Sequence, residues 1–380
     1  MKNIRNFAVI AAALTFLFSC DTPTGGETTY NVDEITEEAK LKNIYEGKFL
    51  IGNIINDTYM SGNYNKILKA HYNTITCEND MKPDYLAPSS SGGAYTFTKA
   101  DRMVNAMLDA GMKVHGHTLV WHSQTPGWLT ASDAEVNMKT YIDTVMKHFA
   151  DRVKSWDVIN EAFVDNATGV TETTDWRTAL RQDSPWFIAL GADYVEMAFK
   201  TARTADPDAI LYYNDYGLNG NNKPMAVRNM IEDINTRYKS DTGTTRNLIE
   251  GIGMQGHYGS SWLNDGSFSA IERNMRYYLA LGIYLDISEL DIEDRSVSNF
   301  SSGKNKKMTQ EAAKKQAEDY ARLFRLLLKL DEEFPDQITR VTMWGIDDRS
   351  SWKSEGNPCL FDGYLNPKPA FDAVSDPASY

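Results

Sequence analysis

The chain of 380 residues is long enough for two or three domains or for one α/β barrel. Hydrophobic residues make up 42% and charged residues 24%, which excludes an intrinsically disordered protein. Asp and Glu outnumber Lys and Arg by 52 to 39, and the net charge of −13 argues against nucleic acid as a partner. The 11% of aromatic residues suits a large core or a sugar-binding cleft.

Residues 1–20 have the pattern of an export signal rather than of a folded element. Basic residues come first, and residues 7–18 form an apolar run that is too short to span a bilayer as a helix. Residues 17–20 resemble a bacterial lipobox, which implies cleavage before Cys20 and a lipid on its thiol; simple secretion is the alternative. We therefore expect an exported lipoprotein, anchored at the periplasmic face or the cell surface. Its parts are a signal peptide (1–19), the lipidated Cys20 with a flexible tether (20–32), and one domain (33–380).

Beyond the tether, short β-rich segments alternate with amphipathic helical patterns. The predicted strands are residues 49–56, 74–77, 113–120, 154–160, 209–215, 251–255, 284–289 and 340–345. The predicted helices include residues 99–111, 134–151, 189–205, 269–282 and 311–333. Eight strands separated by helices predict a (β/α)8 TIM barrel of the α/β class. An open, doubly wound sheet is the alternative, but no glycine-rich dinucleotide motif follows a strand.

Two features stand outside this alternation. Cys77 and Cys359 have apolar neighbours, so we expect buried free thiols, although export permits a disulfide. Residues 296–307 are rich in Ser, Asn and Lys, which predicts an exposed loop after the seventh strand.

Polar and aromatic residues occupy the ends of the predicted strands, where the active sites of such barrels lie. Charged groups are costly to bury there without partners, so groups that converge from several strands predict a functional site. The candidates are Glu78, Asn79, Lys82, His115, His117, Trp121, His122, Asn160, Glu161, Asn214, Asp215, Tyr216, Gln255, His257, Glu289, Asp291, Trp344 and Asp347.

One chemistry that these residues allow uses two carboxyl groups, Glu161 and Glu289, after the fourth strand and on the seventh. These strands lie on opposite sides of a barrel mouth, so the two groups could face a substrate bond between them. Glycosidases need this arrangement, with one acid for the leaving oxygen and one carboxylate for attack. The spacing alone is a weak signal, because 52 acidic residues offer many pairs.

A metal-dependent hydrolase is a second possibility. His115 and His117 are two residues apart and share one face of a strand, and His257 and Asp347 could complete a ligand shell. Against it, the two histidines flank Gly116 without a ligand cluster of recognised spacing.

A protein that binds polysaccharide without cleaving it is the third. Four tryptophans could grip sugar rings, although tryptophan is more often part of a core. A binding protein also has no need of two converging glutamates. The four are Trp121, Trp128, Trp344 and Trp352.

Six segments, in order along the chain, resemble glycoside hydrolase family 10, the endo-β-1,4-xylanases with a (β/α)8 barrel. The resemblance extends from about residue 49 to residue 371. The segments are 76–82 (TCENDMK), 116–124 (GHTLVWHSQ), 156–162 (WDVINEA), 253–257 (GMQGH), 287–291 (ISELD) and 344–348 (WGIDD), the last followed by Ser351 and Trp352.

This resemblance implies roles for individual residues. It makes Glu161 the acid/base and Glu289 the nucleophile of a retaining hydrolysis, with the carboxyl groups about 5–5.5 Å apart. It implies that Asn160 binds the 2-hydroxyl of the reacting sugar and that His257, backed by Asp291, orients Glu289. The other substrate-binding residues it implies are Glu78, Asn79, Lys82, His117, Trp121, His122, Tyr216, Gln255, Trp344 and Trp352.

The substrate implied by the resemblance is xylan or xylo-oligosaccharide, cleaved at internal β-1,4 bonds. It implies no metal and no cofactor, and we expect a monomer. Tolerance of arabinose or glucuronate side chains stays open, as does activity on cellulosic chains, because one extra hydroxymethyl group shifts binding by only about 1–3 kcal/mol.

Overall fold

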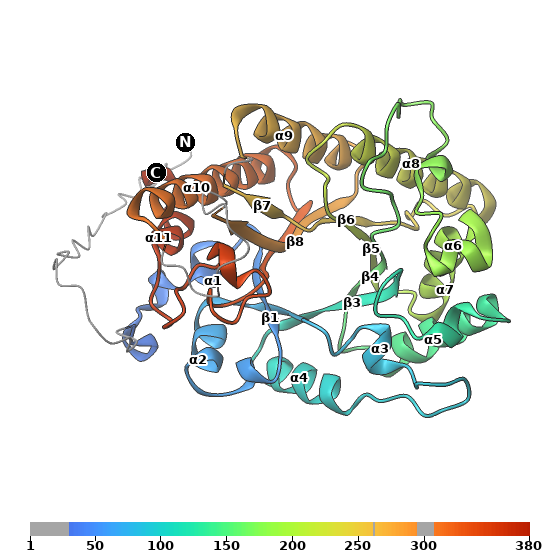
Figure 1. The fold of residues 1–380 in the computed structure, drawn as a ribbon, viewed down its shortest axis with the longest axis horizontal. Coiled ribbons are helices and arrows are strands. Elements are labelled where there is room, and N and C mark those ends of the chain that lie inside the picture. Colours follow the sequence, from blue (N-terminus) through green and yellow to red (C-terminus); the bar gives the residue numbers. More distant parts are fainter. Residues whose placement is uncertain (1–29, 261–262, 295–307) are drawn as a thin grey trace, which may run out of the picture.

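Eight parallel strands form a closed barrel in the computed structural model, which describes residues 30–260, 263–294 and 308–380 (Figure 1). The pairings of β1 with β9 and of β6 with β8 close the sheet. The barrel strands are β1 (Leu50–Ile55), β2 (Thr74–Cys77), β3 (Lys113–Trp121), β4 (Ser155–Asn160), β5 (Ile210–Asp215), β6 (Gly251–Met254), β8 (Tyr284–Glu293) and β9 (Ile338–Met343). The predicted TIM barrel is confirmed, and the open sheet is wrong.

Helices surround the barrel, and the last of them, α11, packs beside α1 and α10, so both ends of the described chain meet (Figure 1). The helices are α1 (Leu41–Ile44), α2 (Gly62–His71), α3 (Pro83–Leu86), α4 (Thr98–Asp109), α5 (Ala134–Phe149), α6 (Pro185–Leu190), α7 (Tyr194–Ala205), α8 (Asn222–Thr242), α9 (Asp265–Leu279), α10 (Gln310–Glu333) and α11 (Pro369–Ser375).

The structure differs from the predicted elements in several places, of which three bear on the site and its surroundings. The helix expected over 189–205 is split into α6 and α7 at Gly191, whose φ of +63° interrupts the helical backbone. Helix α8 follows the fifth strand, as the alternation predicts, but it is not among the helices whose bounds were given from the sequence, and buried polar residues such as Asn229 and Asn235 interrupt its apolar periodicity. A short strand, β7 (His257–Gly259), pairs with the end of β8, which continues beyond the predicted residue 289.

Local sequence sets several helix ends. Gly111 and Gly282 come just after α4 and α9 with φ of +78° and +68°, the left-handed conformation that glycine adopts at helix ends. At the other end of α9, the Asn264 side chain accepts a hydrogen bond from the Ser267 amide at 3.0 Å. Thr309 caps α10 in the same way through the Ala312 amide.

The barrel interior combines close packing with a few charged groups. Trp156 is fully buried against Gly116, where an added Cβ would lie 2.2 Å from the indole ring. An ion pair between Arg340 and Asp286 (2.6 Å) is also buried. Cys77 and Cys359 are free and buried, so this prediction is confirmed.

The packed part of the chain includes Tyr30, earlier than the predicted boundary at residue 33. Its hydroxyl bonds His71 Nε2 at 2.7 Å, and its ring packs against Phe361 and Phe371. The predicted signal peptide, Cys20 and the loop 296–307 lie outside the described residues.

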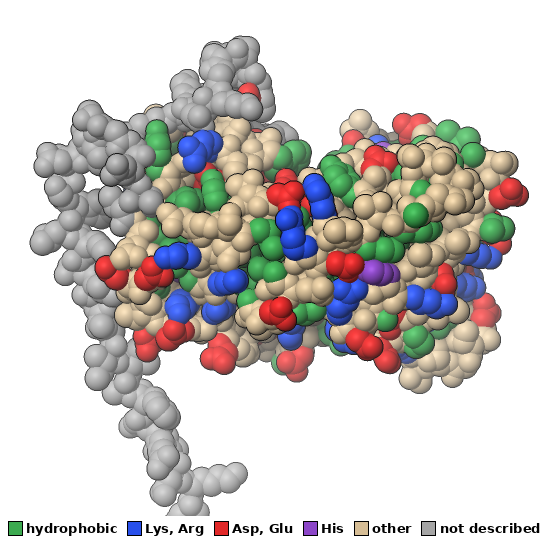
Figure 2. Space-filling model, turned by 90° about the horizontal axis from the view of Figure 1, so that it is seen from below, with side chains coloured by type: hydrophobic (Ala, Val, Ile, Leu, Met, Phe, Trp, Pro, Cys, Tyr) green, Lys and Arg blue, Asp and Glu red, His purple; other side chains and the backbone are tan. Residues whose placement is uncertain are grey.

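The charges of the described surface are mixed. Figure 2 shows acidic and basic side chains intermingled over the face that it draws. Of the helices in residues 30–260, 263–294 and 308–380, none is long and apolar enough to cross a bilayer.

Candidate active site

A cavity of about 620 Å³ opens where the barrel strands end. Its walls come from the carboxyl ends of the strands and from the loops that follow them. The residues predicted from the sequence that line it are Glu78, Asn79, Lys82, His117, Trp121, Asn160, Glu161, Asp215, Tyr216, Gln255, His257, Glu289, Trp344 and Trp352.

Glu161 follows β4 and has both carboxylate oxygens held by neutral donors. The Trp121 indole N–H donates to Oε2 at 2.8 Å, and the Gln255 amide donates to Oε1 at 2.9 Å. The backbone of Glu161 has a φ of +57°, and its N–H donates to the Asn214 carbonyl at 2.9 Å. This left-handed turn ends β4 and directs the side chain into the cavity.

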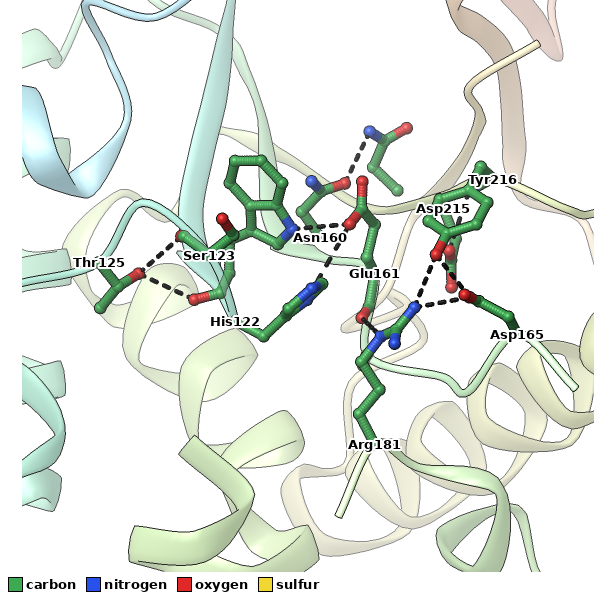
Figure 3. A network of polar contacts seen from close by, with 12 residues as sticks. His122, Ser123, Thr125, Asn160, Glu161, Asp165, Arg181, Asp215 and Tyr216 are labelled. Carbon is green, nitrogen blue, oxygen red and sulfur yellow. Dashed lines mark hydrogen bonds and ion pairs between the residues drawn. The ribbon is translucent and has the colours of Figure 1, made fainter. Parts of the chain in front are cut away.

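A second set of contacts holds Glu161 from outside the cavity (Figure 3). Arg181 donates from Nε to the Glu161 carbonyl at 3.3 Å, and from Nη2 to Asp165 and to the Tyr216 hydroxyl. The Tyr216 hydroxyl in turn donates to Asp165. Arg181 thus links the backbone of Glu161, which follows β4, to Tyr216, which follows the neighbouring strand β5. His122 does not line the cavity; its Nδ1 lies 4.0 Å from Glu161 Oε2.

Glu289 lies on β8 and is 6% exposed. Asn214 donates to its Oε1 at 2.8 Å, and His257 Nε2 lies 3.2 Å from Oε2. Burial favours the neutral carboxyl, but the hydrogen bonds from these two residues and the nearby imidazole charges outweigh it, so the pKa of Glu289 is lowered. The side chain is therefore an anion at neutral pH.

His257 owes its charge to Asp291, one of the residues behind Glu289. Its Nδ1 lies 2.8 Å from Asp291 Oδ2, which also accepts from the Trp352 indole at 3.0 Å. Burial works against the imidazolium, yet the attraction and hydrogen bonds of Asp291 and Glu289 raise the pKa of His257 to about 9.

Glu78 and Lys82 follow the carboxyl end of β2 and line the cavity. Lys82 donates to Asn79 Oδ1 at 2.9 Å, and its ammonium lies 5.2 Å from the centre of the Trp121 ring. Burial lowers the pKa of Lys82, although nearby carboxylates oppose the shift. Glu78 accepts from Asn56 at 2.8 Å, so both polar groups have partners within the protein.

Asp157, buried beneath the cavity, binds both histidines of β3. Its Oδ2 lies 2.8 Å from His117 Nδ1 and its Oδ1 lies 3.0 Å from His115 Nε2. Burial would raise the pKa of Asp157, but the two histidines lower it well below its usual range. The contact to Nδ1 makes Nε2 the nitrogen of His117 that can face a ligand.

The predicted metal ligands are not gathered into one group. His115 and His117 bind Asp157, His257 binds two carboxylates, and Asp347 accepts from the Tyr64 hydroxyl at 3.2 Å. In the described part of the chain, no three His, Cys, Asp or Glu residues form a group that could hold a metal ion. The metal alternative therefore has no ligand set.

The sequence model described as "Glycosyl hydrolase family 10" matches residues 40–377. The chain belongs to glycosyl hydrolase family 10. A protein of Dictyoglomus thermophilum named β-1,4-xylanase is 33% identical over 90% of this chain and 94% of its own length. Because this is a family of hydrolases, the alternative of a protein that binds polysaccharide without cleaving it is wrong.

Solved structures of family 10 proteins have the same fold. A xylanase from termite gut that contains a bacterial Ig-like domain has a TM-score of 0.81 and 38% identity, over 93% of this chain and 80% of that one. An intracellular xylanase from Thermoanaerobacterium saccharolyticum, solved with xylotriose, has a TM-score of 0.74 and 29% identity, over 88% of this chain and 98% of that one.

Several residues of this family 10 site have no role in the sequence prediction. Gln124, Tyr258 and Lys353 also line the cavity. All three lie in or directly beside segments that carry the resemblance, which was a usable signal: Gln124 ends segment 116–124, Tyr258 follows segment 253–257, and Lys353 follows Trp352. Asn214 was noted only as a strand end, yet it bonds Glu289. Trp128 lies elsewhere and donates to the Pro88 carbonyl at 2.7 Å.

Proposed function

We propose that this family 10 chain is a retaining endo-β-1,4-xylanase with Glu161 as acid/base and Glu289 as nucleophile. The observation that carries the proposal is that two carboxylates from separate strands line one cavity, each held by its own donors. The D. thermophilum relative named β-1,4-xylanase and the xylotriose complex of the T. saccharolyticum protein support a xylan substrate.

In the first step, a Glu289 oxygen attacks the anomeric carbon and forms an ester bond. The bond from that carbon to the leaving oxygen breaks, and Glu161 gives its proton to this oxygen. Positive charge develops on the sugar ring, and the Asn160 amide is placed to bind the neighbouring 2-hydroxyl. Asn160 Oδ1 already accepts from Gln255 at 3.2 Å and Asn214 at 3.0 Å, so its N–H groups are left for the sugar.

In the second step, Glu161 is a carboxylate and takes a proton from water. The water oxygen attacks the same carbon from the side that the leaving group vacated, and the ester bond to Glu289 breaks. Two inversions leave the product with the configuration of the substrate.

Proton NMR of xylohexaose with the purified enzyme tests this proposal. We expect β-anomeric reducing ends in the first minutes, unchanged by EDTA, and loss of at least about 10³-fold in kcat for Glu289→Ala. Substantial hydrolysis by Glu289→Ala would reject the nucleophile assignment. Early α-anomers would reject the retaining mechanism, and loss of activity in EDTA would reopen a metal mechanism.

We also propose that the chain is exported, cleaved before Cys20 and held to a membrane by a lipid on that residue. The support is the lipobox-like residues 17–20 and the polar residues after them. Membrane fractionation and mass spectrometry of the mature N-terminus should find the lipidated form, and Cys20→Ala should release the enzyme. If the wild-type protein were soluble and Cys20 unmodified, the lipoprotein proposal would be rejected in favour of simple secretion. The catalytic domain should sediment as a monomer.

A further inference from the structure

The amide of Asn214 lies between two groups of the site, and Ser288 holds it from behind. Asn214 is on β5 and fully buried. Its Nδ2 donates to Asn160 Oδ1 at 3.0 Å and to Glu289 Oε1 at 2.8 Å. Its Oδ1 accepts from the Ser288 hydroxyl at 2.5 Å. Both amide protons and the amide oxygen are therefore engaged.

Only one orientation of this amide suits its neighbours. If it were turned over, Oδ1 would face Asn160 Oδ1 and the Glu289 carboxylate, and three acceptors would meet without a proton among them. The Ser288 hydroxyl favours the observed orientation because it supplies the donor that Asn214 Oδ1 needs in a buried place.

Features of two neighbouring strands, β8 and β6, bring Ser288 to Asn214 and leave room for the Asn214 amide. The pairing of β8 with β9 shifts register between Ile287 and Leu290, and the two residues in between, Ser288 and Glu289, both reach Asn214. On β6, an added Cβ at Gly253 would lie 2.3 Å from Asn214 Oδ1, so a side chain there would push the amide out of place.

We propose that Ser288 is a positioning residue of the hydrolysis, acting through Asn214 on both Asn160 and Glu289. The inference rests on the proposed function, since it concerns the same two-step reaction. Without the Ser288 hydroxyl, Asn214 Oδ1 loses the donor that holds the amide from behind, and the amide can shift away from Asn160 and Glu289. Glu289 then loses a donor that favours its anionic form, and Asn160 loses a contact that directs its N–H groups to the sugar.

Steady-state kinetics with xylohexaose test the role of the hydroxyl. For Ser288→Ala we expect kcat to fall about tenfold, with KM changed less than about twofold, because the ground-state sugar contacts remain. The acidic limb of kcat/KM should move to higher pH, because Glu289 becomes a weaker acid without its donor. Ser288→Thr keeps the hydroxyl and should stay within about threefold of the wild type. The matched control is Thr342→Val on β9, which removes a buried hydroxyl that has no hydrogen-bond partner within the described residues.

A double-mutant cycle separates this role from general destabilisation. Because Ser288 acts through Asn214, adding Ser288→Ala to Asn214→Ala should change kcat by less than about twofold. A tenfold further loss in that background, or wild-type kcat and an unmoved pH profile in Ser288→Ala alone, would overturn the inference while leaving the xylanase proposal intact. Failure of the wild type to cleave xylohexaose would instead reject the proposed function.

Discussion

His257 Nδ1 lies 2.8 Å from Asp291 Oδ2, and this contact determines the charge that His257 presents to Glu289. The Asp291 carboxylate raises the pKa of His257 to about 9 despite its burial. Lys353 approaches the other Asp291 oxygen at 3.2 Å and helps to keep that carboxylate ionised. A cation therefore stands behind Glu289 at neutral pH, where it stabilises the anion that attacks the sugar.

Replacing Asp291 by Asn should lower the pKa of His257, because the attraction is lost while the burial stays. We expect the Cε1–H resonance of His257 to titrate well below pH 9 in Asp291→Asn, measured by NMR. Glu289 would lose a charged donor at neutral pH, so the acidic limb of kcat/KM should move to higher pH. Asp151→Asn is the control, because this carboxylate is 99% exposed. An unchanged His257 titration would show that Asp291 is not the cause.

The contact between His257 and Asp291 makes the free energy of unfolding fall as the pH rises. The pKa of His257 is about 9 in the folded chain and about 6.5 when unfolded, so the folded state binds the extra proton between these values. This contribution is complete below about pH 6.5 and is lost as the pH rises through about 9. A pKa shift of this size corresponds to a contribution on the order of 3 kcal/mol to the free energy of unfolding. Urea unfolding at pH 6.5 and 9.5 should show a steeper loss in the wild type than in Asp291→Asn, and parallel curves would contradict it.

Gly116→Ala should destabilise the barrel, because the new methyl would lie 2.2 Å from the ring of Trp156. Overpacking of this kind costs about 1–3 kcal/mol. Gly127→Ala is the matched control, because an added Cβ there meets nothing within 4 Å. Urea unfolding of both variants measures the difference, and equal midpoints would mean that Trp156 can move aside.

Trp121→Phe should reduce kcat about tenfold, because it removes the indole N–H that donates to Glu161 Oε2 at 2.8 Å but keeps an aromatic ring. Trp128→Phe removes an equivalent hydrogen bond, to the Pro88 carbonyl at 2.7 Å, away from the cavity. We expect wild-type kcat for this second variant in the same xylohexaose assay. Similar losses in both would assign the effect to packing rather than to Glu161.

Much of the barrel can be predicted because each strand is a short apolar segment that ends in polar residues. Strand β2 was predicted without error, and the other barrel strands begin within two residues of expectation. The bounds of α8 were harder to predict, because its buried residues include the polar Asn229 and Asn235. Asn235 bonds the Ile249 carbonyl at 2.9 Å, a partner that no periodicity reveals.

The residues that gather at the cavity follow from the order of strands, since parallel strands bring their carboxyl ends to one rim. The order of strands does not determine the pKa values of these residues or the hydrogen bonds between them. The pKa of His257 depends on Asp291 and Glu289 lying within 3.2 Å, and the position of the Asn214 amide depends on Asn160, Glu289 and Ser288 together. These distances arise from the register shift in β8 and the closure of the barrel, because electrostatic and hydrogen-bond energies change steeply over an ångström while a sequence records only the order of residues.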